Sequence, residues 1–230
     1  MLIIQPRTRD ASGAVTSRRA VWRQKSRKFG PATFEQALRC RQDVAIYGPH
    51  SAGKSRWLAR MHEHAPSLWT RRPVALLRGL EPLAVWLEQP ALMDWHATRE
   101  GVQPWEKLRQ VDKVAALRHW VEECKPVLLL DDTHKLTGRK ADLVAQLVRV
   151  AGVVVHTASE EARIGLSLRI ALQARGPQVV RLASEAAYDY TGPLVWVLCL
   201  ICAAAGAWPV AAAIGGLKVL GRGSRAAKQT

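Results

Sequence analysis

Acidic residues are scarce in this sequence. The 230 residues include 19 Asp and Glu against 34 Lys and Arg, so the formal net charge is +15 at pH 7. A surplus of this size favours anionic partners, either nucleic acid or an anionic membrane surface, and it says nothing about the fold. An arginine-rich genome would produce the same surplus without any such partner.

Cysteine is also rare, and its four positions are scattered: Cys40, Cys124, Cys199 and Cys202. This pattern excludes the disulfide framework of a small secreted domain and fits a reducing compartment. The opening residues MLIIQPRTRD contain too short an apolar run for a signal peptide, so we expect the amino-terminal bulk of the chain to stay in the cytoplasm. Internal repeats and low-complexity segments are absent as well.

The charged side chains of the first 30 residues are almost all basic. This stretch contains eight basic residues and a single acid, Asp10, without apolar periodicity. We therefore expect residues 1–30 to form a flexible basic arm that can lie along phosphates.

Short apolar runs alternate with helical patterns over residues 31–190. The expected strands lie at residues 44–47, 74–77, 126–132, 152–159 and 178–182. Between them, residues 105–124 place apolar side chains at three-to-four spacing: Leu108, Val111, Val114, Leu117, Val121 and Cys124. This alternation predicts an α/β fold, a three-layer sandwich whose five-stranded, mostly parallel sheet is covered on both faces.

A glycine-rich loop follows the first of these strands. The stretch GPHSAGKS matches the pattern G-x-x-x-x-G-K-[ST], and a helix is expected from Lys54 to about Glu63. Backbone N–H groups of such a loop surround phosphates, the lysine reaches the β- and γ-phosphates, and the hydroxyl of Ser55 ligates Mg²⁺. The candidate ATP-binding residues are Gly48, Pro49, His50, Ser51, Ala52, Gly53, Lys54 and Ser55.

Two acids end the third expected strand, in VLLLDDTHKL. Open α/β sheets gather their ligands at the carboxyl ends of the strands. Asp131 is placed to hold Mg²⁺ and Asp132 to polarise an attacking water, which with Lys54 would give a P-loop ATPase site. A base-reading Asn-Lys-x-Asp motif for GTP is missing.

The segments GPHSAGKS, VLLLDDTHKL and VVVHTASEEARIGLSLRIALQAR resemble the AAA+ class of P-loop ATPases, in particular the compact branch of transposition-helper and origin-binding ATPases. The resemblance implies a homo-oligomer and a polar γ-phosphate sensor after the fourth strand, at Thr157 or Ser159. It also implies an arginine before the fifth strand that enters a neighbour's site, Arg175 by position or Arg169 as the alternative. The chain departs from the family at Asp132, where Glu is usual, and in having no evident helical lid.

No charged residue occurs between Asp189 and Lys218. As one helix, Pro193–Leu217 would be about 37 Å long, more than the roughly 30 Å of a bilayer core. We therefore expect a membrane segment at residues 191–220 and a basic tail at 221–230. A single span would export this basic tail against the positive-inside tendency, so a re-entrant hairpin turning at Gly206–Pro209 is the alternative topology.

Together these features predict an ATPase domain (residues 31–190) held at the cytoplasmic face of the inner membrane. Its work would be on DNA, for example in a phage or mobile element, with the basic arm as the contact. Two alternatives remain open. One is an assembly or export ATPase of the filamentous-phage type, in which the positive charge serves lipid and the partners are proteins. The other is a nucleotide switch that does not hydrolyse.

Overall fold

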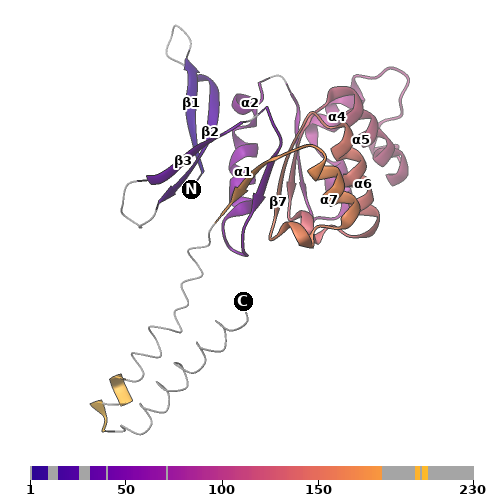
Figure 1. Cartoon of the computed structure of the whole chain (residues 1–230). Helices are drawn as coiled ribbons and strands as arrows, with labels where there is room; N and C mark the ends of the chain where they lie inside the picture. Colours follow the sequence, from indigo (N-terminus) through magenta and orange to yellow (C-terminus); the bar gives the residue numbers. More distant parts are fainter. Residues whose placement is uncertain are drawn as a thin grey trace. The chain divides into compact units, whose positions relative to one another are not determined.

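A parallel sheet of five strands forms the middle layer of residues 41–182 in the computed structural model (Figure 1). The structure describes residues 2–9, 15–25, 32–39, 41–70, 72–182, 200–202 and 204–206, and the chain divides into the units Met1–Ser184 and Glu185–Thr230. The sheet has the order β5-β6-β7-β4-β8. Its strands are β4 (Val44–Tyr47), β5 (Val74–Arg78), β6 (Val127–Asp131), β7 (Val153–Ala158) and β8 (Gln178–Arg181).

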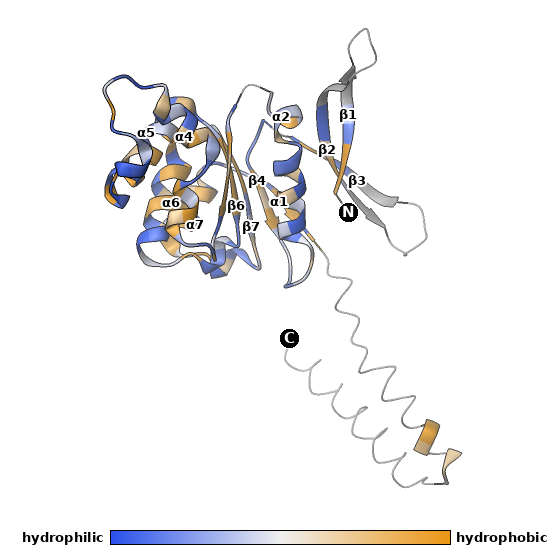
Figure 2. Ribbon diagram, turned by 180° about the vertical axis from the view of Figure 1, so that it is seen from behind, coloured by the Kyte–Doolittle hydropathy of each residue, from blue (hydrophilic) through white to orange (hydrophobic). Residues whose placement is uncertain are grey.

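The predicted α/β sandwich with a five-stranded parallel sheet is confirmed, because all four strand pairings are parallel. Both faces of the sheet are buried. Alternate residues of β6 point to opposite sides, so Leu128 and Leu130 join one core while Val127 and Leu129 join the other. Figure 2 shows the apolar character of these inner strands. A strand buried on both faces becomes a continuous apolar run in the sequence, which is why these strands were predictable.

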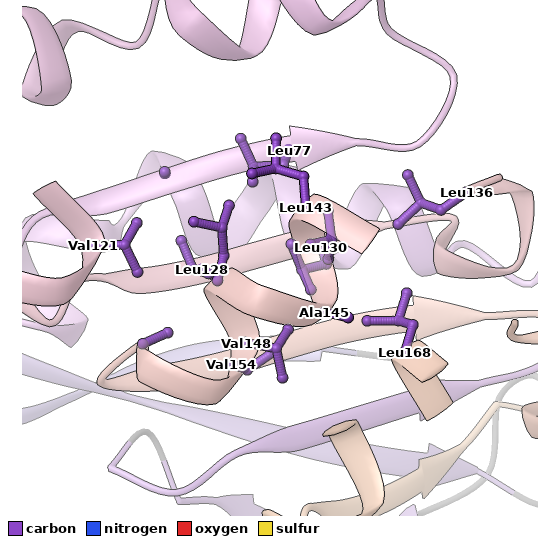
Figure 3. Close-up of a cluster of buried hydrophobic side chains, with 14 of the residues drawn as sticks. Leu77, Val121, Leu128, Leu130, Leu136, Leu143, Ala145, Val148, Val154 and Leu168 are labelled. Atoms are coloured by element: carbon purple, nitrogen blue, oxygen red, sulfur yellow. The ribbon is translucent and has the colours of Figure 1, made fainter. Parts of the chain in front are cut away.

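Most of the helices cover the first face of the sheet (Figure 1). They are α3 (Leu83–Leu87), α4 (Pro90–Ala97), α5 (Gln110–Cys124), α6 (Gly138–Val150) and α7 (Leu166–Gln173). Figure 3 shows Leu128 and Leu130 of the sheet beside Val121 of α5 and Leu143 of α6. Short 3₁₀ turns, η1 (Trp105–Lys107), η2 (Thr133–Lys135) and η3 (Glu161–Arg163), link the elements.

The apolar face predicted for residues 105–124 is confirmed except at Val111, since Leu108, Val114 and Cys124 are partly buried against the same core as the residues that follow. Leu117 and Val121 are buried, together with Trp120, which is 1% exposed. Val111 is 77% exposed, and Leu108 precedes the helix. The helix begins only at Gln110, so Leu108 reaches the core from the segment before it.

The second face of the sheet packs on α1 (Lys54–Glu63), α2 (Ala65–Leu68) and a separate antiparallel sheet. That sheet consists of β1 (Leu2–Arg9), β2 (Val15–Lys25) and β3 (Ala32–Leu38), in this order. The expectation of a flexible arm over residues 1–30, followed directly by the ATPase domain, is therefore wrong. The small sheet also takes in residues 32–38.

Cross-strand pairing explains why the residues of β1, β2 and β3 form a regular sheet. Leu2 pairs with Trp22 and Ala20 with Leu38, and Leu2, Ala20 and Leu38 are all buried in the core that also contains Trp57 of α1. Arg60 of α1 donates a hydrogen bond of 3.2 Å to the Leu2 carbonyl oxygen. The alternating apolar positions are few and are separated by arginines, so the sequence shows no obvious period.

The expected membrane segment at 191–220 and the tail at 221–230 lie outside the described residues, apart from 200–202 and 204–206. Within the part of the chain that is described, none of the helices combines the length and apolarity needed to cross a bilayer.

Candidate functional site

At two positions of the loop between β4 and α1, only glycine fits. Gly53, the residue before α1, has φ +82°, a left-handed conformation that side chains disfavour. A Cβ on Gly48 would lie 2.8 Å from the Leu182 carbonyl oxygen, closer than atoms can pack. The two glycines of the motif are thus explained by conformation and by space, as a loop folded tightly around an anion requires.

Lys54 is the first residue of α1 and is only 6% exposed. Its Nζ donates hydrogen bonds to the carbonyl oxygens of Gly48 (2.7 Å) and Pro49 (2.8 Å). Burial lowers the pKa of Lys54 from its usual value, and the charges of Asp132 and Asp131 act against this shift. The ammonium group therefore lies across the mouth of its own loop, on the side of the two acids.

Asp131 ends β6 and is 5% exposed. Its Oδ1 accepts a 2.6 Å hydrogen bond from the hydroxyl of Thr157 on β7. The same hydroxyl oxygen accepts the backbone N–H of Asp132 at 2.9 Å. Because β7 lies between β4 and β6, Thr157 stands between the loop strand and the acidic strand and fixes the orientation of the acids.

Asp132 has φ +54°, an uncommon conformation for a residue other than glycine. Its Oδ2 lies 2.6 Å from Nζ of Lys135, the last residue of η2. The carboxylate expected to polarise water is thus held by an ion pair within its own turn.

A cavity of about 690 Å³ opens between the loop and the acidic turn. It is lined by the loop residues Gly48, Pro49, His50 and Lys54, and by Asp132 from the opposite side. Ser51 has φ +64°, and the Ala52 N–H donates to the Pro49 carbonyl at 3.3 Å, so both shape the loop.

Ser55 and Asp131 line a second hollow of about 440 Å³, which Asp132 also borders. The described residues contain no cluster of three or more His, Cys, Asp or Glu side chains that could enclose a metal. Mg²⁺ does not need one, since it is usually held by one or two protein oxygens together with phosphates and water. The hydroxyl of Ser55 and the carboxylate of Asp131 suit that role.

The outer wall of this second hollow is held by Lys140 of α6. Its Nζ donates to the carbonyl oxygens of Gly79 (2.8 Å) and Glu81 (2.7 Å) and lies over the Trp86 ring. The Gly79 N–H donates to the Asp131 carbonyl oxygen at 2.8 Å. These contacts keep the end of β5 against the end of β6.

The structure does not support the role expected for Arg175. Its guanidinium donates to both carboxylate oxygens of Asp43, at 2.5 and 3.1 Å, and to the Val148 carbonyl oxygen at 2.9 Å. Asp43 precedes β4, so this pair lies at the amino-terminal edge of the sheet, opposite to the loop. A guanidinium held in this way is a structural link and is not free to enter a neighbour's site. Arg169, the alternative, lines a small cavity of about 120 Å³ with Tyr47.

Several residues around the site were not predicted from the sequence. His134, Arg163 and Arg181 line the 690 Å³ cavity, and Lys135 pairs with Asp132. Arg181 ends β8, so the rule that strand ends gather ligands could have identified it. The other expected sensor, Ser159, also lines this cavity, whereas Thr157 is wholly buried beneath it.

No protein-family profile and no curated protein matches this sequence. Among solved structures, the chain is similar to Cdc6p of Pyrobaculum aerophilum (15% identity, TM-score 0.39, 61% of this chain and 38% of that one). It is also similar to Orc1 of Aeropyrum pernix in complex with DNA (17%, 0.40, 62% and 39%). A third is domain III of the replication initiation protein DnaA of Thermotoga maritima (17%, 0.37, 61% and 54%).

The chain thus spans only 38% to 54% of the lengths of these three structures. What the protein binds or does has to be argued from its own residues. The strand order and the loop geometry give the chain an α/β fold of the P-loop NTPase type.

Proposed function

We propose that the protein is a Mg²⁺-dependent ATPase. One observation carries the proposal: Asp132 faces the glycine loop and Lys54 across one cavity and also borders the neighbouring hollow that Ser55 and Asp131 line. ATP is favoured over GTP because the sequence has no Asn-Lys-x-Asp base-reading motif.

Each residue has a defined task in this site. The loop N–H groups and Lys54 bind the β- and γ-phosphates, and the ammonium group exchanges its carbonyl partners for phosphate oxygens. Ser55 and Asp131 would hold Mg²⁺, which would supply positive charge to counter that of the phosphates. Thr157 keeps Asp131 oriented for this contact. Asp132 orients the attacking water once its carboxylate separates from Lys135.

The nucleotide switch is a second candidate, and the ion pair between Asp132 and Lys135 favours it. The carboxylate of Asp132 is held 2.6 Å from the Lys135 ammonium group, so it has to leave this ion pair before it can orient a water. Because Asp is also shorter than the Glu usual in the AAA+ class, turnover is expected to be slow. The chain would then act mainly through the difference between its nucleotide-bound and nucleotide-free states.

The proposal also covers the oligomeric state, the location and the substrate of the protein. The AAA+ resemblance suggests a homo-oligomer, with Arg169 as the remaining candidate for a residue that reaches a neighbour's site. The uncharged run between Asp189 and Lys218 suggests attachment to the cytoplasmic face of the inner membrane. The net charge of +15 suggests DNA as the substrate.

Phosphate release from ATP tests the proposed reaction. Asp132→Asn is expected to leave ATP affinity intact and to lower turnover by about a hundredfold or more, because the water loses its orienting carboxylate. Asp142→Asn, on the exposed side of α6, is the matched control and is expected to behave like the wild type. Normal turnover in Asp132→Asn would remove Asp132 from the reaction, and a wild type that binds ATP without releasing phosphate would support the switch.

A further inference from the structure

The turn after β6 is joined to the end of β7 by a row of hydrogen bonds, which we call the β6–β7 clasp (residues 131–134 and 157–159). The Asp132 N–H donates to the Thr157 hydroxyl oxygen at 2.9 Å, and the Thr133 hydroxyl donates to the Thr157 carbonyl oxygen at 2.9 Å. The Ser159 N–H donates to Nδ1 of His134 at 3.3 Å. The imidazole is therefore held by the backbone of the residue that follows β7.

The hydrogen bond from Ser159 decides where the His134 ring carries its proton. Because Nδ1 accepts an N–H, it is unprotonated, and the neutral ring bears its hydrogen on Nε2. Burial lowers the pKa of His134; Asp132 opposes this, while Lys135, Lys54 and Arg163 add to it. At neutral pH the ring is uncharged and offers one donor, the Nε2–H.

The surroundings of the ring call for a hydrogen-bond acceptor. His134 is half-buried and lines the 690 Å³ cavity together with Lys54 and Ser159. The hydroxyl oxygen of Ser159 is buried and has no hydrogen-bond partner among the described residues. A buried hydroxyl is normally paired, so this part of the wall suits a ligand that supplies oxygen atoms.

Phosphate oxygens are the ligand that this position suits. Lys54 and the loop provide the positive charge, and the clasp borders the same cavity beside Asp132. A terminal phosphate bound next to Asp132 would lie against the clasp, whereas the β-phosphate, cradled by the loop, would not.

We propose that His134 donates its Nε2–H to the terminal phosphate and makes the site prefer a nucleoside triphosphate to a diphosphate. The inference rests on the proposed function, since the loop has to bind the nucleotide first. It assigns His134 the role of a specificity-determining residue, oriented by the Ser159 amide. The same contact would report the presence of that phosphate to Asp132, two residues away in the clasp.

Two substitutions distinguish the roles of the two ring nitrogens of His134. In His134→Asn, the side-chain amide stands where Nδ1 was and can accept the Ser159 N–H, but nothing reaches the Nε2 position. In His134→Gln, the longer amide places an N–H donor near the Nε2 position. Full-length wild type and both variants are titrated with ADP and with a non-hydrolysable ATP analogue, each with Mg²⁺.

His134→Asn is expected to bind the ATP analogue about tenfold more weakly, the effect of one lost hydrogen bond to a charged group, and to keep its ADP affinity. His134→Gln is expected to retain most of the preference for the triphosphate. An unchanged ratio of the two affinities in His134→Asn would overturn the inference. So would an equal loss for both nucleotides, or a His134→Gln variant as impaired as His134→Asn.

The wild type distinguishes this inference from the proposed function. If it binds neither nucleotide, the proposed function fails and the inference fails with it. If it binds both, and Lys54→Ala loses both affinities, then the loop binds the nucleotide. The ratio of the two affinities in His134→Asn then tests the role of His134 alone. Thermal unfolding of each variant confirms that the compared proteins are folded.

Discussion

At the scale of single residues, His156 is an ionisable side chain buried at the centre of the sheet. It lies on β7 and is 1% exposed; its Nε2 is 3.3 Å from the Tyr47 hydroxyl oxygen, and its Nδ1 has no hydrogen-bond partner among the described residues. Burial lowers its pKa to about 4, against an opposing effect of Asp43. The folded protein therefore contains a neutral imidazole that resists protonation.

This histidine should make stability depend on pH. The unfolded chain protonates His156 below about pH 6.5, whereas the folded chain does so only near pH 4. Stability is complete above pH 6.5 and is lost as the pH falls toward 4, by up to about 3 kcal/mol. Urea unfolding at pH 7.5 and at pH 4.5 measures the free energy of unfolding at each pH. Between these pH values, His156→Leu is expected to lose about 2–3 kcal/mol less of this free energy than the wild type.

His119→Leu on the exposed surface of α5 is the control for this measurement, since it is expected to keep the wild-type pH dependence. If His156→Leu loses as much stability at pH 4.5 as the wild type does, the buried neutral state of His156 is wrong.

At the scale of elements, the sequence predicted the features that contiguous residues encode and missed those that depend on contacts between distant segments. The strand, loop and helix around Lys54 form one contiguous pattern, and so do β6 and its two acids. The small sheet depends on partners 6 to 20 residues apart, from Arg9 with Val15 to Leu2 with Trp22, and its arginines obscure the alternation. The Lys135 ion pair and the His134 contact depend on how η2 folds, which no motif encodes.

Arg175 was misplaced for a reason that topology explains. It comes shortly before β8, and β8 is parallel to β4. A residue that precedes a parallel strand lies at the edge opposite to the loop that follows β4, beside Asp43, which itself precedes β4. Position along the sequence alone suggested a role in a neighbour's site, whereas strand direction indicates a structural one.

Arg175→Met is accordingly expected to destabilise the fold without acting on nucleotide chemistry directly. The change leaves the Asp43 carboxylate, 9% exposed, without its cation, which should cost about 3 kcal/mol in urea unfolding. Arg118→Met, on the exposed side of α5, is the control and should cost less than about 0.5 kcal/mol. Full stability together with lost ATP turnover in Arg175→Met would restore the role at a neighbour's site.

The whole chain contains two regions of different character. The unit Met1–Ser184 contains both cores and every residue assigned to the site. The uncharged run from residue 190 to 217 belongs to the other unit. If the second region only attaches the first to a membrane, the two functions should separate cleanly.

Truncation after Tyr190 tests that separation. The shortened protein is expected in the soluble fraction of a cell lysate, with unchanged ATP affinity, because Lys54, Ser55 and Asp131 all remain. The full-length chain is expected in the membrane fraction, and detergent should be needed to extract it. A full-length protein that stays in solution without detergent would contradict membrane attachment while leaving the nucleotide site untouched.

An equilibrium titration of full-length Lys54→Ala with ATP and Mg²⁺ tests whether the loop after β4 binds nucleotide phosphates. Loss of the ammonium group is expected to weaken binding by at least about a hundredfold, because hydrogen bonds between charged groups are lost at the β- and γ-phosphates. Lys107→Ala, an exposed lysine of η1, should bind as the wild type does. Equal affinities of a folded Lys54→Ala and the wild type would contradict the account.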